Sequence, residues 1–431
     1  MSGRTIKRIL SPFEQFVHSE STGGVTLIFA SIIAFAWANS PWAPWYLDLR
    51  EIKFGIGLGG WSLEKPLLLW VNDGLMAFFF YLVGLEIKRE VLVGELSEPR
   101  DATLAVVAAV GGMAVPASIY AAINWGGDGI SGWGVPMATD IAFALGMMAL
   151  LGDRVPLALK VFLTALAIVD DLGAVLIIAL FYTSEISVPS LLVAAGALVL
   201  AFLYGRLGGR NLKVLAFIGL VVWFFVLQSG VHATVAGVLV ALATPIRRKI
   251  SPKNLRSELR AGLDQGEFEE VEVKVANLER VLGDAQSPLH RLEHLMHPWV
   301  AFLILPIFAL FNAGVALGGW AGVTGPVTLG VLLGLLLGKP LGVLGFSWLA
   351  TKTGIASLPD GVGWREMTGA GLLAGIGFTM SLFVGGLAFD GGEMLESAKL
   401  GILSASVVAA VLGLVLLARA FPGERGSRRS E

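Results

Sequence analysis

Two adjacent aspartates, Asp170 and Asp171, lie in the middle of an apolar run, 161–182, that contains no other charged residue. At about 1.5 Å per residue, a helix of this length crosses the hydrocarbon core of a bilayer, which is roughly 30 Å thick. A carboxylate at that depth costs roughly 3 kcal/mol on insertion scales, and ionised neighbours repel each other. A pair at a helix end would avoid these costs, but apolar residues flank both sides. The pair is therefore predicted to be functional.

The composition indicates a protein that crosses the membrane many times. Of the 431 residues, 55% are hydrophobic and 15% are charged, and the mean hydropathy is +0.76. Soluble proteins carry about 25% charged residues. The chain has no cysteine, which excludes disulfides, thiolate metal sites and a cysteine nucleophile. The first 24 residues lack the pattern of a cleaved signal peptide, and a net charge of −2 gives no reason to expect nucleic acid as a partner.

Apolar segments long enough to span a bilayer occur twelve times, so the predicted fold is an all-α polytopic membrane protein. Spans 1–8 fill residues 1–245, a charged cytoplasmic loop covers 246–297, spans 9–12 fill 298–418, and a cytoplasmic tail covers 419–431. All belong to one integral membrane domain. The predicted spans are 24–39, 66–86, 102–123, 134–151, 157–182, 188–205, 212–228, 230–245, 298–318, 327–350, 367–388 and 399–418.

Lysine and arginine residues lie mostly on one side of the predicted spans. The N-terminal cations, the loop 246–297 and the tail fall together on one side, whereas the other side receives only four basic residues. Because cytoplasmic loops are enriched in Lys and Arg, we expect both termini in the cytoplasm. The four residues on the external side are Arg50, Lys53, Lys65 and Lys399.

Two connections have patterns of their own. Residues 50–65 alternate around the glycine-rich turn 57–60, which predicts a small external β-hairpin, although a bare surface loop is the alternative. The edges of such a hairpin could pair with a second copy and form a homodimer. In the long loop, an apolar stripe predicts an amphipathic helix; its members are Phe268, Val271, Val275, Leu278 and Leu282.

Three further spans deviate from plain apolar helices. The fourth contains Pro136 followed by Asp140, the tenth contains Lys339 followed at once by Pro340, and the eleventh has a glycine cluster at 371–377. Proline removes a backbone donor, so interrupted helices are expected there. The fourth and eleventh spans take matching places in spans 3–5 and 10–12, which run in opposite orientations and so predict inverted repeats.

Interrupted helices that cross at the midplane would expose N–H ends with partial positive charge and C=O ends with partial negative charge. Asp140 would offset the first and Lys339 the second. Lys339 could also approach the aspartates of the fifth span. Neighbouring positions on a helix point about 100° apart, so of Asp170 and Asp171 one should face a water-filled cavity and the other a neighbouring helix.

At this point the residues resemble a known family, the NhaA type of sodium/proton antiporter. The similarity runs in order from the first spans to the last, and inverted repeats with broken helices are typical of that family. One departure is the internal loop, which is longer here by about 35 residues before His290, judged from the motif spacing. The matching motifs are Trp70–Met76, Gly84–Glu90, Ala138–Gly146, Val169–Ala174, Ser229–Thr234, Gly338–Gly342 and Gly375–Ser381.

The resemblance implies a role for each matching residue. Asp171 would be the principal Na⁺ ligand, with Asp170 as its partner, salt-bridged to Lys339 in one state. Thr139 and Asp140 would lie at the crossing and help to shape the cation site. His232 would tune the pH profile. A cytoplasmic pH-sensing cluster would contain Glu86, Arg89, Glu90, Glu293, His294 and His297.

The implied activity is electrogenic, pH-regulated exchange of Na⁺ or Li⁺ for protons across a prokaryotic inner membrane. The family pattern is two protons in for one sodium out. Burial and repulsion favour protonated Asp170 and Asp171 near neutral pH, and hard cations would compete with those protons for the carboxylate oxygens. The protein would be a secondary active transporter and not an enzyme, without a cofactor, embedded in lipid as a homodimer.

Several alternatives stay open at this stage. His232 is often a packing residue in such positions, and Asp73, near mid-span in the sequence, could line the cavity or bond a neighbouring backbone. Glu293, His294 and His297 have metal-ligand side chains, but their spacing fits one helical turn and nothing more. A sodium-coupled symporter is the closest rival function. An intramembrane aspartyl protease would use two acids, but its Tyr-Asp and Gly-x-Gly-Asp motifs are missing.

Overall fold

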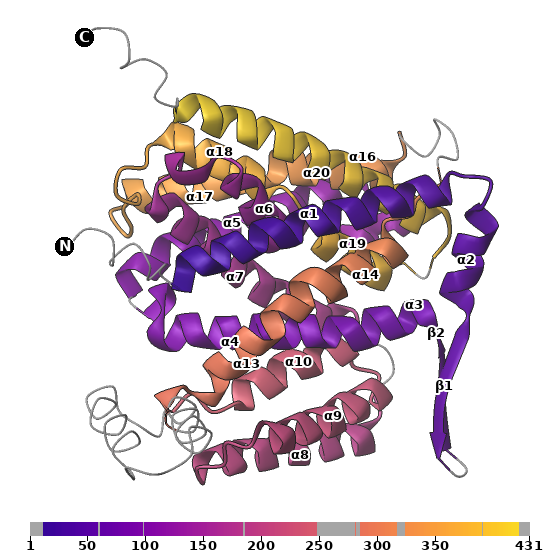
Figure 1. Ribbon diagram of the computed structural model, residues 1–431. Coiled ribbons are helices and arrows are strands. Elements are labelled where there is room, and N and C mark those ends of the chain that lie inside the picture. The colour runs from indigo at the N-terminus through magenta and orange to yellow at the C-terminus, as the bar shows by residue number, and fades with distance from the viewer. Residues whose placement is uncertain are drawn as a thin grey trace, which may run out of the picture. The chain divides into compact units, whose positions relative to one another are not determined.

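The structure is a computed structural model that describes residues 12–58, 61–97, 99–183, 186–247, 281, 285–316, 324–389 and 391–421. These residues are mostly helical, and Figure 1 shows their arrangement. The first eight spans are α1 (Pro12–Ala38), α3 (Leu67–Leu69) with η2 (Trp70–Leu75) and α4 (Met76–Val93), α5 (Pro99–Ile123), η4 (Asp128–Met137) with α6 (Ile141–Ala149), α7 (Leu157–Phe181), α8 (Val188–Arg206), α9 (Leu212–Gln228) and α10 (Ala233–Ala243).

The remaining four spans follow the loop. Short connections add α2 (Ala43–Glu51), η3 (Glu95–Ser97) and η5 (Gly152–Arg154). The chain divides into two compact units: residues 1–76, 90–183 and 299–431 form unit 1, and residues 77–89 and 184–298 form unit 2. Spans 9–12 are α13 (Pro288–Trp299) with η6 (Val300–Ile304) and α14 (Leu305–Asn312), α16 (Pro326–Leu333) with η7 (Gly334–Gly338) and α17 (Lys339–Lys352), α18 (Trp364–Ala374) with α19 (Phe378–Ala388), and α20 (Gly392–Ala420).

The predicted polytopic membrane fold is confirmed. Among the described residues, seven helices are long and apolar enough to cross a bilayer, or up to nine if two bent helix pairs are each counted as one span. One of these pairs, α18 with α19, is bent by 43° at the predicted break of the eleventh span. The predicted spans that this count leaves out are the short helices α9 and α10 and the interrupted fourth span, η4 with α6.

Some boundaries differ from the sequence-based prediction. The ninth span begins at Pro288, inside the predicted loop 246–297, because its amphipathic first turns continue into apolar helix. Asp73 lies in the first turns of the second span and not at its middle, since that span extends to Val93. The predicted amphipathic helix around Phe268 lies outside the described residues. The helix α2 was not predicted.

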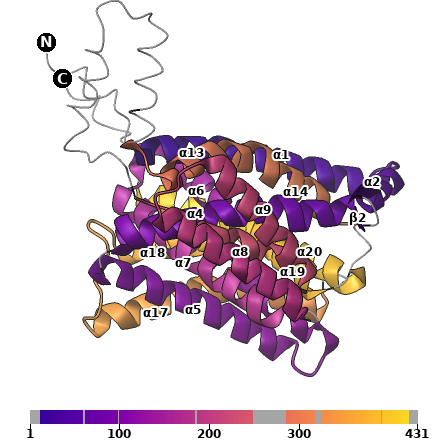
Figure 2. The same ribbon diagram turned by 90° about the horizontal axis from the view of Figure 1, so that it is seen from below.

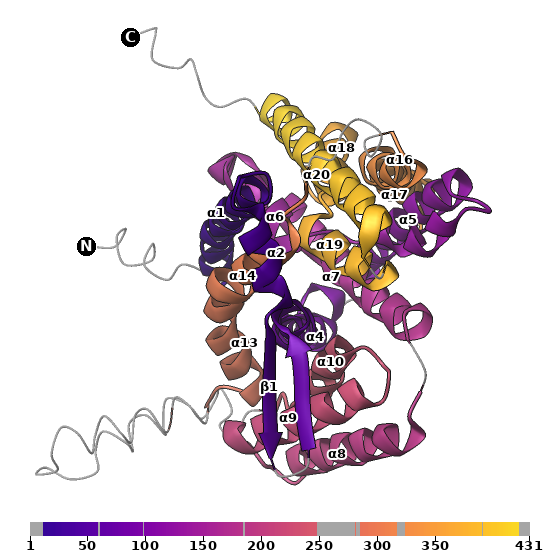
Figure 3. The ribbon, with the colours of Figure 1, turned by 90° about the vertical axis from the view of Figure 1, so that its right-hand side faces the viewer.

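The predicted hairpin is present. β1 (Lys53–Leu58) and β2 (Trp61–Pro66) pair in antiparallel fashion, with Phe54 opposite Lys65, and lie side by side in Figure 3. Two contacts attach the hairpin to the start of the second span. Lys65 forms a 2.7 Å ion pair with Asp73, and the indole N–H of Trp70 donates to the carbonyl of Phe54 at 2.8 Å.

The third and tenth spans, which open the two predicted repeats, touch through their backbones. α5 and α17 lie side by side in Figure 2, and Gly111 faces Gly342 at their contact. A Cβ atom on Gly111 would lie 2.4 Å from the carbonyl oxygen of Gly342, and one on Gly342 would lie 2.1 Å from that of Gly111. Only glycine fits at either position, because small residues allow helix backbones to approach closely in lipid.

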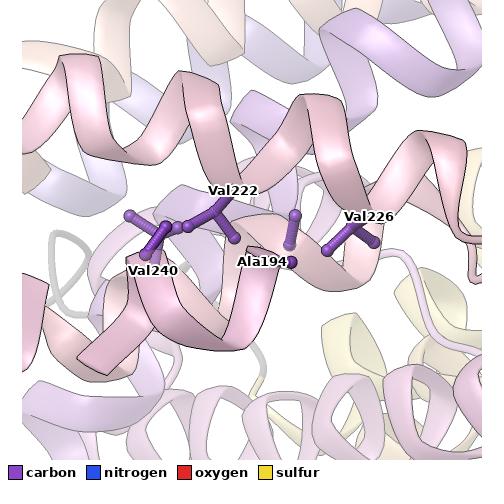
Figure 4. Close-up of a cluster of buried hydrophobic side chains, with 6 residues drawn as sticks. Ala194, Val222, Val226 and Val240 are labelled. Carbon is purple, nitrogen blue, oxygen red and sulfur yellow. The ribbon is translucent and has the colours of Figure 1, made fainter. Parts of the chain in front are cut away.

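Unit 2 is built on α8, α9 and α10 together with the middle of α4. Ala194, Val222, Val226 and Val240 pack between the three helices of the predicted sixth to eighth spans (Figure 4). α4 joins this group at Gly84, where a Cβ atom would lie 2.7 Å from the Cβ of Ala241. Close packing at Gly84 therefore holds the middle of α4 against α10.

Candidate cation and proton site

The site lies within unit 1, where the fourth and eleventh spans are interrupted. Residues 138–140 are extended between η4 and α6, and residues 375–377 separate α18 from α19. The two interruptions bond directly to each other. The backbone N–H of Asp140 donates to the carbonyl of Ile376 at 2.7 Å, and the hydroxyl of Thr139 donates to the carbonyl of Ala374 at 2.9 Å. The crossing therefore satisfies carbonyls at the end of α18 that would otherwise have no donor.

Asp140 caps two helices with one carboxylate. Its Oδ1 accepts the backbone N–H of Phe143 at 2.9 Å, which makes Asp140 the N-cap of its own helix α6. Its Oδ2 accepts the backbone N–H of Thr379 at 3.0 Å and also the hydroxyl of Thr379, in the first turn of α19. The side chain offsets the positive ends of both broken helices, as the charge argument predicted.

Lys339 provides a positive charge at the same crossing. Its side chain is fully buried, and Nζ lies 2.6 Å from Oδ2 of Asp170 in α7. Nζ also donates to the carbonyl of Met137, the last residue of η4. Gly112 brings α5 close to α17 beside the lysine stem, since a Cβ atom there would lie 3.0 Å from Cγ2 of Val343. The ammonium therefore neutralises one carboxylate and one helix end at once.

Asp171 is the second acid of the fifth span and is 1% exposed. It acts electrostatically on Lys339, although the ion pair is made by Asp170. The unequal roles follow from their positions, since successive residues point about 100° apart on a helix. Close packing continues past the pair, where a Cβ atom on Gly173 would lie 2.2 Å from the sulfur of Met113 in α5.

The formal charge of the site is unbalanced. Three carboxyl groups, those of Asp140, Asp170 and Asp171, are buried with a single ammonium group. Three donors already occupy the oxygens of Asp140, and within the described residues no three acidic, histidine or cysteine side chains gather as a metal-ligand set. The other two carboxyl groups of the site, those of Asp170 and Asp171, both belong to α7.

Sequence reasoning missed three hydroxyl residues at the crossing. Thr379 binds Asp140, the hydroxyl of Ser381 donates to the carbonyl of Val135 at 2.8 Å, and Ser406 of α20 accepts the first N–H of α19, from Phe378, at 3.2 Å. Thr379 and Ser381 belong to the motif Gly375–Ser381, and hydroxyls in the first turn after a glycine break are typical helix-start residues. Nothing in the sequence marks Ser406.

The predicted pH-sensing residues lie mostly in unit 2. Arg89 forms a 3.0 Å ion pair with Glu293 of α13, while Glu86 is buried. Glu90 belongs to unit 1. His294 is exposed, His297 lies in the last turn of α13, and His232 directly precedes α10.

Lys88, which belongs to the motif Gly84–Glu90, caps the C-terminal end of α10. Its ammonium donates to the carbonyls of Leu242 at 2.6 Å and Thr244 at 2.5 Å. Carbonyls at a helix C-terminus carry partial negative charge, so a lysine is stabilising there.

Comparison with known proteins identifies the family of this chain. The family model described as Na⁺/H⁺ antiporter 1 matches residues 14–417. The chain belongs to this family. It is 49% identical over 425 residues to the Na⁺/H⁺ antiporter NhaA of Oleidesulfovibrio alaskensis, covering 96% of this chain and 94% of the relative.

Other antiporter relatives are similarly close. The NhaA of Rhodospirillum rubrum is 49% identical over 416 residues, covering 95% of this chain and 97% of the relative. That of Sulfurimonas denitrificans is 44% identical over 428 residues, covering 96% of each. As a member of this antiporter family with several spanning helices, the chain is a multi-pass membrane protein.

Proposed function

We propose that this chain exchanges Na⁺ or Li⁺ for protons, with the ions competing for the carboxylates of Asp170 and Asp171. The observation that carries the proposal is the fully buried ion pair of Lys339 and Asp170 beside a second buried carboxylate, Asp171. In a low-dielectric interior such a group of charges is stable only while protons or cations balance it. Membership of an antiporter family supports the same conclusion.

The coupling follows from competition at one site. Cation binding to Asp171 with help from Asp170 weakens the hold of Asp170 on Lys339, and the released ammonium then loses its proton. A site that opens to one side of the membrane at a time returns protons for each sodium, without a nucleotide. Two protons against one Na⁺ would move net charge, so the exchange is electrogenic. Thr139 and Asp140 keep the crossing in shape and are not displaced.

Three further properties belong to the proposal. The protein lies in a bacterial inner membrane with both termini in the cytoplasm, as the lysine and arginine distribution supports. The hairpin β1–β2 pairs two copies into a homodimer. The ion pair of Arg89 and Glu293, with Glu86, Glu90, His294, His297 and His232, adjusts activity to cytoplasmic pH.

The test is proton flux in proteoliposomes that contain the purified protein and no other solute. We expect a Na⁺ gradient to drive protons into vesicles that contain the wild-type protein and so to acidify their interior. We expect Asp171→Asn to abolish this acidification. Asp128→Asn is a matched control, because Asp128 is exposed at the start of η4. Acidification that survives Asp171→Asn would overturn the proposal. A requirement for an added organic solute would indicate a symporter, and peptide cleavage without ion flux would indicate a protease.

Electrogenicity is tested in the same vesicles with a voltage-sensitive dye. Charge movement that is unchanged in both Asp170→Asn and Lys339→Ala would remove these residues from proton carriage.

A further inference from the structure

The short helix α2 turns sharply away from the membrane-spanning helix before it. The α1 segment from Gly23 to Ala38 and α2 (Ala43–Glu51) meet at 112°, and α2 leads into β1 (Figure 1). A helix almost perpendicular to a spanning helix runs roughly along the membrane plane. α2 therefore begins where the first span ends and points across the axis of that span.

One face of α2 is attached to the protein. Tyr46 is 1% exposed, and its hydroxyl donates to the carbonyl of Leu310 at 2.8 Å. Gly314 leaves space for this ring, since a Cβ atom there would lie 2.3 Å from the Tyr46 hydroxyl. The guanidinium of Arg50, one turn later, lies 5.5 Å from the centre of the same ring. These contacts fix the rotation of α2 about its axis.

With that rotation fixed, a second face is aromatic and uncovered. Trp42 and Trp45 are 68% and 72% exposed, and Leu49 follows at the spacing that continues their face. A third face carries Asp48 and Glu51, both exposed. At 100° per residue, Asp48 and Glu51 point away from Tyr46, and Leu47, which is 54% exposed, lies between Arg50 and Glu51. One face thus meets protein, one is aromatic, and one carries the two acids beside Leu47.

We propose that α2 is an interfacial anchor whose tryptophans lie at the headgroup boundary of the bilayer, while Asp48 and Glu51 face water. Tryptophan is enriched at this boundary because its indole ring is apolar with one polar N–H. An amphipathic helix in this position buries its apolar face about 5–10 Å into the interface. Since α2 continues into β1, the anchor sets the depth of the hairpin. This inference does not depend on the transport activity.

The chain has no cysteine, so single-cysteine variants can be spin-labelled without removing native residues. The variants Trp42→Cys and Trp45→Cys report on the aromatic face, and Asp48→Cys and Glu51→Cys are matched controls on the charged face. In liposomes, the collision rate of each label is measured with oxygen, which concentrates in lipid, and with a water-soluble nickel chelate.

We expect oxygen collisions to exceed nickel collisions at least threefold at positions 42 and 45, and the reverse at 48 and 51. Nickel collisions that dominate at all four positions would place α2 in water and overturn the proposal. Labels at 42 and 45 that reach neither reagent would show a protein surface, such as a second copy, covering this face, and would also overturn it. Leu49→Cys reports from the same face if either tryptophan variant fails to fold.

Discussion

Two of the ion pairs described above, Lys339–Asp170 and Arg89–Glu293, are made of similar groups in different surroundings. The side chains of Lys339 and Asp170 are 0% exposed, whereas those of Arg89 and Glu293 are 29% and 15% exposed. Water and salt screen the second pair in part, so it contributes less to stability than a fully buried pair would lose on separation. The first pair has no such screening, and separating it leaves a buried charge at a cost of about 3–5 kcal/mol.

The difference in exposure indicates which of the two pairs can couple the exchange of cations and protons. In the proposed exchange, a buried carboxylate that loses its ammonium partner must take up another positive charge, which would couple the two ions at Asp170 and Asp171. A partly exposed pair can open without a replacement ion, because water reaches both groups. In the proposed function it adjusts activity with pH and does not carry the transported ions.

The largest effect should follow from breaking the buried pair on one side only. Lys339→Ala leaves Asp170 buried without its ammonium, and we expect the free energy of unfolding to fall by about 3–5 kcal/mol. Adding Asp170→Asn should recover most of that loss, since a neutral amide replaces the charge. Thermal melting of the purified protein in detergent measures both. If the double variant melts no higher than Lys339→Ala, the buried pair is not held together by charge.

A smaller loss is expected at Asp140, a buried acid that is balanced by N–H groups and not by an ammonium. Asp140→Ala removes the cap of α6 and α19 and should lower the free energy of unfolding by about 2 kcal/mol. Asp140→Asn retains one acceptor oxygen, and so one of the two caps, while its NH2 group meets a donor at the other helix, so its loss should be only somewhat smaller. The same melting assay ranks the two variants. Equal losses would mean that the negative charge matters more than the capping bonds.

Thr379 allows a single hydrogen bond within the crossing to be tested. Thr379→Val removes one hydroxyl that donates to Asp140 and should reduce the free energy of unfolding by about 1 kcal/mol. Thr379→Ser keeps the donor and is the matched control. Chemical denaturation followed by tryptophan fluorescence reports the difference. A loss of the same size in the serine variant would point to the methyl group and not to the hydrogen bond.

The smallest effect on stability is expected when the partly exposed pair of Arg89 and Glu293 is broken, but breaking it should change the pH profile of transport. Glu293→Gln should alter the free energy of unfolding by less than about 1 kcal/mol. We expect it, and also His294→Ala, to shift the pH at which Na⁺-driven proton flux begins. Arg365→Gln, an exposed cation of α18, is the control. Flux profiles of both variants that superimpose on the wild type would remove these residues from pH sensing.

The sequence predicts most of this arrangement because charge inside a membrane span is rare and visible. Asp140, Asp170, Asp171 and Lys339 each interrupt an apolar run, and hydropathy alone locates the spans around them. Residues whose part depends on an unusual backbone were harder to find. Thr379 becomes important only because α19 restarts beside Asp140, and α2 has only nine residues, too few for a hydrophobic pattern to stand out in the sequence.

Other differences have equally local reasons. The first half of the fourth span, η4, is a tighter 3₁₀ helix that contains Pro136, whereas α18 and α19 are ordinary helices on both sides of their break. Sequence symmetry between the two repeats did not indicate this asymmetry. The glycine-rich turn 57–60, by contrast, was a sufficient signal for the hairpin.

The glycine contact between α5 and α17 constrains how this chain can evolve. Because Gly111 and Gly342 each occupy the space that the other's side chain would need, neither site can accept a larger residue first, and even simultaneous replacement would push the helices apart. Lys339 lies three residues from Gly342 along the same segment, so any such separation would also displace the ammonium. The two positions should therefore be among the least tolerant of drift in the whole chain.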